Sequence, residues 1–458
     1  MVTVESLLEL YNYAPNPGEM VYVKGFWDKN DGGGGFFIFD EESTLNPFFN
    51  DASYFKIGFN VNYDGMVCKS ISSTTGRWIR QWDRGKLNLR WFGAVPDWAP
   101  VKDTSKALNA ALEYAQFTSK SDSSATIFDN YLYTRPGKTI FIPTGRYKFH
   151  SAISSIYYGV VIEGEGNMGT SSHGTRLLIL HEYTKDDEAI TGEERDHYGF
   201  FRYYANMANN SGGGIKNLTI DIASNYNSNV ILLVSKDKIT PSQKKPEDKN
   251  ALNYNSAVSK WKAENIVLSM RGKALRAIYM RSYQEEGVLP WRIRDTSIIN
   301  CWFAGASIEG QTVSACNASG LQIVGGFFSS GLGVGINPIQ PGLFLWGKHG
   351  CANVHLNGLD LTYGYIKIHK KSTLINVNCR FGMLLIYNRE DKSHKDLRVT
   401  KYYTLNLEGN TSKIPNTSQN LNSQEGYLSY RNTGEIENDI LSNQDNLNDS
   451  KATGSWLS

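Results

Sequence analysis

A short strand-like segment that recurs from residue 215 onward constrains the fold of this chain more than any other feature. Each copy has a turn-type residue followed three positions later by an apolar residue, except the last, which has Leu374 at the turn position. The turn positions of successive copies are 21 to 48 residues apart. Irregular repeats of this length indicate a solenoid, and strand repeats with Gly and Asn turns indicate a β-helix. The copies are residues 215–222, 263–270, 293–300, 319–324, 352–357 and 373–378.

Composition agrees with a β-rich protein that has a large core. Hydrophobic residues make up 40% of the 458 residues, which excludes global disorder. Glycine is frequent, at 43 residues, and proline is rare, at 13, as expected for many tight turns between short strands. The predicted fold class is therefore all-β, with a parallel β-helix as its main part.

The same data exclude several function classes. The longest aliphatic run, 230–234, is far shorter than the roughly 20 apolar residues that span a bilayer, so we expect no membrane insertion. Lys plus Arg total 47 against 45 for Asp plus Glu, a balance that disfavours nucleic-acid binding. No CxxC pair and no metal-ligand spacing of histidines occurs, so we expect free thiols, no metal and no cofactor. The first ten residues lack the pattern of a secretory signal.

Three regions are predicted along the chain. Residues 1–90 form a small β region, with two strands joined through the glycine run at 32–35. Residues 91–400 form the β-helix. Residues 401–458 are rich in Asn, Ser, Thr and Gln, and we expect a polar tail or a segment that contacts other subunits.

A helix is predicted over residues 103–117, near the start of the β-helix. Asp103, Thr104 or Ser105 can cap it, and the apolar residues that follow are spaced to form one stripe. The first turn of a β-helix exposes strand edges, and a helix at this point is expected to cover them.

Three motifs in this region resemble the opening of pectate-lyase-like right-handed parallel β-helix proteins. Residues 91–97 (WFGAVPD), followed by Asp103 and the helix, resemble the family's WFGA-type strand. Residues 141–147 (FIPTGRY) resemble its IPxGxY element, and residues 161–166 (VIEGEG) resemble the strand that comes next. The sequence departs from the family at residues 96–98, where a Gly-Asp-Gly turn is common.

Upstream, residues 30–37 and 76–80 resemble the region that precedes the coil in many bacteriophage tailspikes. The resemblance implies a homotrimeric spike on the virion tail. Such a spike acts outside the cell on a bacterial capsule or exopolysaccharide and has phage tail or baseplate proteins as partners. The superfamily includes hydrolases, lyases, epimerases and non-catalytic proteins, so the activity does not follow from the fold. We expect a depolymerase, with glycosidic hydrolysis slightly favoured over β-elimination. The alternatives are a non-catalytic glycan-binding receptor and a secreted bacterial polysaccharide lyase.

A second set of segments predicts where a polysaccharide would bind. Residues 305–310 match 342–347 in spacing, and 277–281 and 364–369 fit the same frame. Alternate residues of these strands point outward, and stacked turns lie about 4.8 Å apart, so outward neighbours could contact one sugar. The expected substrate-binding residues are Tyr279, Arg281, Trp346 and His369.

The candidate catalytic residues are carboxylates, because glycoside hydrolysis uses a pair of them about 5 to 9.5 Å apart. Glu309 falls in the same outward column, and Asp221 is expected to face outward from another sheet. The simpler alternative for each is a solvated or turn residue. Asp295 shares a turn position with Asn217 and is expected to be structural. Lys367, together with Arg281, could bind an acidic glycan.

Overall fold

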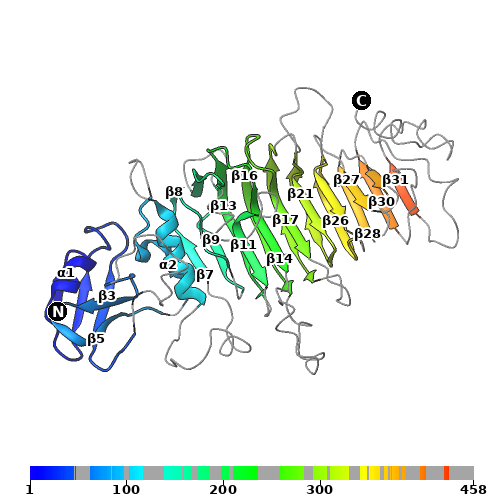
Figure 1. Ribbon diagram of the computed structural model, residues 1–458. Helices are drawn as coiled ribbons and strands as arrows, with labels where there is room; N and C mark the ends of the chain where they lie inside the picture. The colour runs from blue at the N-terminus through cyan, green and yellow to red at the C-terminus, as the bar shows by residue number, and fades with distance from the viewer. Residues whose placement is uncertain are drawn as a thin grey trace, which may run out of the picture. The chain divides into compact units, whose positions relative to one another are not determined.

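The computed structural model shows a chain built mainly of β-strands with few helices (Figure 1). It divides into two compact units, one of residues 1–182 and 214–220 and the other of residues 183–213 and 221–458. The predicted all-β class and the parallel β-helix are confirmed. Within the described ranges, no helix is long and apolar enough to cross a membrane. The structure describes residues 1–45, 47, 62–83, 85–96, 103–116, 139–156, 159–167, 174–184, 198–205, 210–235, 257–282, 292–306, 310–329, 341–347, 350–361, 366–369, 372, 374–380, 384–387, 403–408 and 428–432.

The first unit begins with a five-stranded sheet in the order β1-β2-β3-β5-β4, and its predicted hairpin is confirmed. β2 and β3 are antiparallel, and Val21 pairs with Phe37 in a core that also contains Trp78. The strands are β1 (Val2–Val4), β2 (Met20–Val23), β3 (Gly35–Asp40), β4 (Val67–Ser70) and β5 (Ser73–Arg80).

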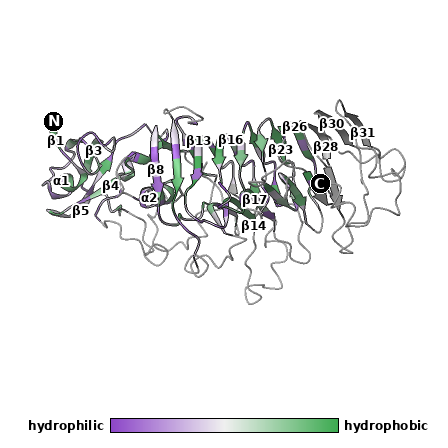
Figure 2. Cartoon of the chain, turned by 90° about the horizontal axis from the view of Figure 1, so that it is seen from above, coloured by the Kyte–Doolittle hydropathy of each residue, from purple (hydrophilic) through white to green (hydrophobic). Residues whose placement is uncertain are grey.

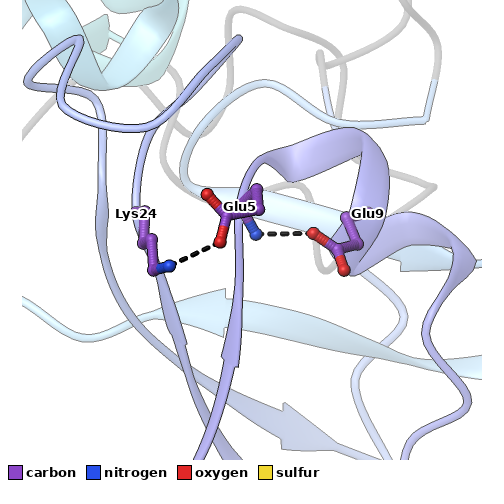
Figure 3. Close-up of polar contacts among 3 residues, drawn as sticks. All are labelled: Glu5, Glu9 and Lys24. Carbon is purple, nitrogen blue, oxygen red and sulfur yellow. Dashed lines mark hydrogen bonds and ion pairs between the residues drawn. The ribbon is translucent and has the colours of Figure 1, made fainter.

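Helix α1 (Leu7–Asn12) is fastened to this sheet at its first turn. Ser6 caps the helix, and the Glu5 N–H donates a hydrogen bond to Glu9 Oε2 at 2.6 Å. Lys24, which directly follows β2, forms an ion pair with Glu5 (Figure 3). The entry of the chain into the helix is thereby tied to the neighbouring strand.

The glycine run between β2 and β3 is held by a buried arginine. The Arg80 guanidinium donates hydrogen bonds to the carbonyls of Gly33 and Gly34, each at 2.7 Å, and lies over the Phe37 and Trp91 rings. A side chain at Gly34 would lie 2.5 Å from the Val23 carbonyl oxygen, so only glycine fits there. Burial lowers the pKa of Arg80 to about 9. Arg80 therefore holds the glycine run in one conformation.

The first turns of the coil follow in the same unit. Strands β6, β7, β9 and β13 pair in parallel, and Leu87, Ile140, Ile162 and Ile215 form one fully buried column across them. The elements are β6 (Leu87–Asn88), the 3-10 helix η1 (Leu89–Phe92), β7 (Thr139–Ile142), β8 (Gly145–Phe149), β9 (Val161–Gly164), β10 (Thr175–Ile179) and β13 (Gly214–Ile222), the last of which ends in the second unit.

The predicted helix is confirmed as α2 (Thr104–Gln116), and Asp103 is its cap. The Asp103 carboxylate accepts hydrogen bonds from the Ser105 N–H at 2.9 Å, the His150 N–H at 3.0 Å and the Ser151 hydroxyl at 2.6 Å. Burial alone would raise the pKa of Asp103, but these hydrogen bonds outweigh it and lower the pKa. One side chain thus caps the helix and joins it to the segment that follows β8.

Replacing Asp103 with alanine should lower the free energy of unfolding at pH 7 by about 1–2 kcal/mol, because the cap and its tie to residues 150 and 151 are lost. The folded-state pKa lies below the ordinary value of about 3.9, so this stabilisation is present above that pH and declines as the pH falls through the folded-state pKa. Urea unfolding at pH 7 and pH 3 measures both effects. Lys106→Ala, at an exposed position of α2, is the control; equal stability of the two variants at pH 7 would contradict the assignment.

The second unit is a coil of stacked turns whose strands form three parallel sheets (Figure 1). The first sheet has seven parallel strands: β11 (Gly199–Ala205), β14 (Asn229–Ser235), β17 (Arg276–Ser282), β21 (Val313–Cys316), β25 (Leu343–Trp346), β27 (Ile366–His369) and β29 (Leu384–Tyr387). The smallest contains β12 (Asn210–Ser211), β15 (Val258–Ser259), β18 (Ile293–Arg294) and β22 (Ala318–Ser319). The third contains β16 (Lys262–Ser269), β19 (Ser297–Ile299), β20 (Trp302–Ala304), β23 (Gln322–Val324), β24 (Phe327–Phe328), β26 (Val354–Asp360), β28 (Leu374–Arg380), β30 (Tyr403–Glu408) and β31 (Leu428–Asn432).

Side chains of equivalent strand positions stack into the core of this unit. Hydrophobic residues recur along strands such as β17 (Figure 2). Each inward residue packs on its counterpart one turn away, which removes both from water. One fully buried column consists of Phe201, Ile231, Ile278, Val313, Leu343 and Ile366.

The predicted turn residues do sit at corners of the coil, but they mark two different corners. Asn265 and Asn300 occupy one corner, and Asp295 and Asn353 occupy another; all four have φ between 50° and 54°. The pairing of Ala263 with Ile298 shows that our alignment of 263–270 with 293–300 was wrong by five residues. Both corners need a left-handed residue followed three positions later by a buried one, so the pattern cannot tell them apart. Asp295 occupies a left-handed corner, as expected, but it lies beside Gly320 and not on the corner of Asn265.

The predicted polar tail contains two further strands of the coil. β30 pairs in parallel with β28, and β31 pairs in parallel with β30. The expectation that the β-helix ends near residue 400 was therefore wrong. Alternation of Leu405 and Leu407 with polar residues is the strand signal that the Asn-rich composition obscured.

Candidate glycan-binding site

Two columns of residues that point away from the core lie on neighbouring strands of the seven-stranded sheet of the second unit. Tyr279, Ser314, Phe344 and Lys367 pair in register along the first column. Arg281, Cys316 and Trp346 pair along the second. The alternating residues Met280 and Leu345 are fully buried, as predicted. The sheet therefore brings together three of the expected substrate-binding residues, Tyr279, Arg281 and Trp346.

The aromatic side chains of these columns form one cluster with parallel rings. The Trp346 ring centroid lies 5.9 Å from that of Phe344 and 6.5 Å from that of Tyr279, with 8° between the planes in each pair. The Trp346 Nε1–H donates a hydrogen bond to Ser314 Oγ at 2.9 Å, which fixes the indole orientation. We call Tyr279, Phe344 and Trp346 the aromatic cluster.

Cationic side chains flank this cluster. The Arg276 guanidinium lies 4.6 Å from the centroid of the Tyr279 ring, and Lys367 Nζ lies 5.7 Å from that of Phe344. Hydrogen bonds to Gln311 at 2.9 Å and Asn229 at 3.0 Å hold Arg276 in place. Positive charge thus stands at both ends of the cluster.

The members of the cluster differ in their access to solvent. Tyr279 is only 2% exposed, whereas Phe344 and Trp346 are half-buried. Burial raises the pKa of the Tyr279 phenol, against the opposing charges of Arg281 and Arg276. Tyr279 therefore supports Trp346 from below the surface as a neutral phenol, and the exposed parts of Trp346 and Phe344 are available to a ligand.

The position expected for Glu309 is occupied by Cys316, which pairs with Arg281 on one side and Trp346 on the other. Glu309 itself lies outside the described residues. The expected frame was wrong because Gly305 and Gly310 pack against Arg271 and Leu275, which connect β16 to β17. The strand consequently begins after Gly310 and not before it.

The packing of Gly310 makes this register testable. An added Cβ would lie 1.8 Å from the Leu275 carbonyl oxygen, so Gly310→Ala should lower the free energy of unfolding by about 1–3 kcal/mol. Gly166→Ala is the matched control, because a Cβ there meets no atom within 4 Å. Thermal unfolding of both variants measures the difference, and an unchanged Gly310→Ala protein would refute the register at this turn.

Asp221 does not join the aromatic cluster. It lies on β13, outside the seven-stranded sheet, and is 3% exposed, with its carboxylate 3.8 Å from the Arg271 guanidinium. Asp221 is therefore buried, and the simpler alternative of a solvated surface residue was wrong. An ion pair explains its burial, because a buried carboxylate requires a partner of opposite charge.

The remaining expectations concern His369, thiols and metals. The backbone of His369 pairs with Tyr387 between β27 and β29; the position of its side chain is outside the described structure. Cys68, Cys301, Cys316 and Cys351 are buried free thiols, as predicted. Among the residues that the structure describes, no group of three or more His, Cys, Asp or Glu side chains could hold a metal ion.

Two residues that order the site, Arg276 and Ser314, are not evident from the sequence. Arg276 is three residues before Tyr279, and Ser314 is the position on which the Trp346 indole is anchored. The Arg-x-x-Tyr spacing offers only a weak signal, and Ser314 offers none, because its role depends on which strand lies beside β25.

Comparison with known proteins now identifies the family. The sequence profile described as rhamnogalacturonase A/epimerase, pectate lyase-like matches residues 87–317, just over half of the chain. The chain belongs to this family. The match begins at β6 and ends just after β21, so the pectate-lyase-like region includes Arg276, Tyr279, Arg281 and Ser314. No curated protein matches the sequence.

Solved structures with a similar chain trace include two phage tailspikes and a bacterial enzyme. Tailspike gp49 of Acinetobacter baumannii bacteriophage Fri1, a capsular polysaccharide depolymerase, is 12% identical with a TM-score of 0.46, covering 95% of this chain and 75% of its own. The tailspike of Acinetobacter phage vB_ApiP_P1 is 12% identical with a TM-score of 0.45, covering 95% and 71%. WceF of Pantoea stewartii, a glycan biofilm modifying enzyme, is 12% identical with a TM-score of 0.45, covering 96% and 52%. At this identity, any activity has to be argued from the residues of this pectate-lyase-like chain itself.

Proposed function

We propose that the chain is a tailspike-like depolymerase that binds and cleaves a bacterial surface polysaccharide on the outward face of the seven-stranded sheet. The observation that carries the proposal is the aromatic cluster, whose partly exposed Trp346 and Phe344 are fixed on a rigid sheet and flanked by Arg276 and Lys367. Aromatic side chains contact the apolar faces of sugars, and the neighbouring polar and charged groups can bind hydroxyls and acidic substituents. Membership of a pectate-lyase-like family supports the same substrate class.

Hydrolysis is the favoured reaction. Elimination needs a base that takes a proton from the sugar, and the raised pKa and 2% exposure of Tyr279 make it a poor base at neutral pH. Hydrolysis instead needs a protonated acid and a second carboxylate. Glu309, next to Gly310 in the segment that leads into β21, is our proposed acid or base. A second carboxylate could come from another subunit.

Glu309→Gln should lower kcat for polysaccharide cleavage by at least about 100-fold, because general acid–base catalysis contributes that much. Asp221→Asn, which removes the charge that faces Arg271, should lower stability while the folded protein keeps its activity. Polymer length and new reducing ends measure cleavage, and thermal unfolding checks folding. Full activity of Glu309→Gln would remove Glu309 from the mechanism. A rise in ultraviolet absorbance during the reaction would indicate elimination instead.

A non-catalytic glycan-binding receptor is the second candidate. No Asp or Glu occurs within the seven strands of the sheet as the structure bounds them, so those strands present no catalytic carboxylate. Purified protein that binds capsule polysaccharide without shortening it would favour the receptor over the depolymerase.

The proposed spike is a homotrimer on the virion tail, held to phage tail or baseplate proteins. An apolar patch on the third sheet supports self-association: Trp302 is 49% exposed and Val324 is 39% exposed, and half-buried Ile299 and Phe327 pair beside them. Exposed apolar surface of this kind is typical of subunit interfaces.

The double variant Trp302→Lys/Val324→Lys should shift the protein from trimer to monomer, because two charges would be buried without partners. Sedimentation velocity measures the assembly state. Gln322→Lys, an exposed residue on the same strand as Val324, is the matched control and should remain trimeric. A trimer formed by the double variant would place the interface elsewhere.

A further inference from the structure

Positive charge is concentrated on the sheet that carries the aromatic cluster. The seven strands contain Arg202, Arg276, Arg281 and Lys367 and no acidic residue, although the chain as a whole has 47 basic and 45 acidic residues. The composition of the chain therefore does not predict a positively charged face. The face forms because strand pairing places these seven strands side by side.

The cations also have a defined order along the sheet. Arg281 lies on β17, Trp346 on β25 and Lys367 on β27, and β21 lies between β17 and β25. Three strand spacings of about 4.8 Å separate Arg281 from Lys367, roughly 14 Å in all. This span exceeds one sugar ring, so the two cations can meet acidic groups on different units of one polymer while the exposed aromatic rings contact the units between them.

We propose that the polysaccharide bound at this face carries carboxylate groups, recognised by Arg281 and Lys367 at opposite ends of the aromatic cluster. This inference rests on the proposed function and adds the chemical class of its substrate. A guanidinium can bind a carboxylate through two parallel hydrogen bonds, and an ammonium adds a point charge, so acidic and neutral polymers of the same backbone are distinguished.

The test compares one polysaccharide before and after chemical reduction of its carboxyl groups. The probe is the capsular polysaccharide of a bacterial strain whose capsule the purified protein binds or shortens. Calorimetric binding to the Glu309→Gln protein, which keeps the polymer intact, should weaken at least about tenfold after reduction. Binding of the native polymer should also weaken as salt rises.

Two variants locate the effect. Arg281→Gln and Lys367→Gln should each weaken binding of the native polymer about tenfold and leave binding of the reduced polymer unchanged. Lys262→Gln, on β16 of the third sheet, is the control and should bind both polymers as the parent does. Arg281 also contacts Tyr279, so its replacement could change folding, and thermal unfolding is measured for each variant. Lys367→Gln tests carboxylate recognition independently of that contact.

The outcomes separate this inference from the proposed function. Equal binding of the native and reduced polymers, or a bound polysaccharide that has no carboxyl groups, would overturn the inference and leave the depolymerase proposal standing. Failure to bind or shorten any capsule across a broad strain collection would overturn both.

Discussion

Parallel pairing between successive turns is the interaction on which the second unit depends. Each strand forms backbone hydrogen bonds with its counterparts one turn before and one turn after, so a residue's neighbours are set by the register and not by proximity in sequence. The same pairing builds the buried column that contains Ile278 and the outward columns that contain Tyr279 and Trp346. One register therefore determines both the core packing and the geometry of the site. A slip of one residue would turn the inward side chains outward and the outward side chains inward.

Local sequence patterns were sufficient to predict the β-helix, its turn residues and helix α2, because each has a characteristic pattern of residues. A left-handed corner favours Asn, Asp or Gly, and Asp103 precedes a helical apolar stripe. The pattern was not sufficient to predict which corner each repeat marks. Asn265 and Asp295 satisfy the same local rule on different corners, and only the pairing of Ala263 with Ile298 separates them. The strands beyond residue 400 are difficult to predict because the alternation of Leu405 and Leu407 lies within an Asn-rich stretch.

The candidate site was likewise predicted only in part from the sequence. Alternation within β17 and β25 correctly predicted that Tyr279, Arg281 and Trp346 share an outward face. The strand between them was misassigned, because the Gly-to-Gly spacing of residues 305–310 equals that of residues 342–347. The contact of Gly310 with Leu275 shows that the strand begins after Gly310. This contact depends on the length of the connection in the preceding turn of the coil. A single-chain pattern contains no information on which turn packs on which, so Cys316 and Ser314 could not have been predicted as members of the site.

The buried Arg80 has a consequence for how the N-terminal region can change over time. Its guanidinium donates hydrogen bonds to the carbonyls of Gly33 and Gly34 and lies where a side chain at Gly35 would have to go. Losing the arginine would leave these acceptors without their donor, and gaining a side chain at Gly34 would collide with the adjacent strand. Neither the arginine nor the glycines can be replaced alone without loss of stability, so related sequences should keep or lose them together. Their covariation in descendants would trace the ancestry of this small sheet independently of the coil that follows.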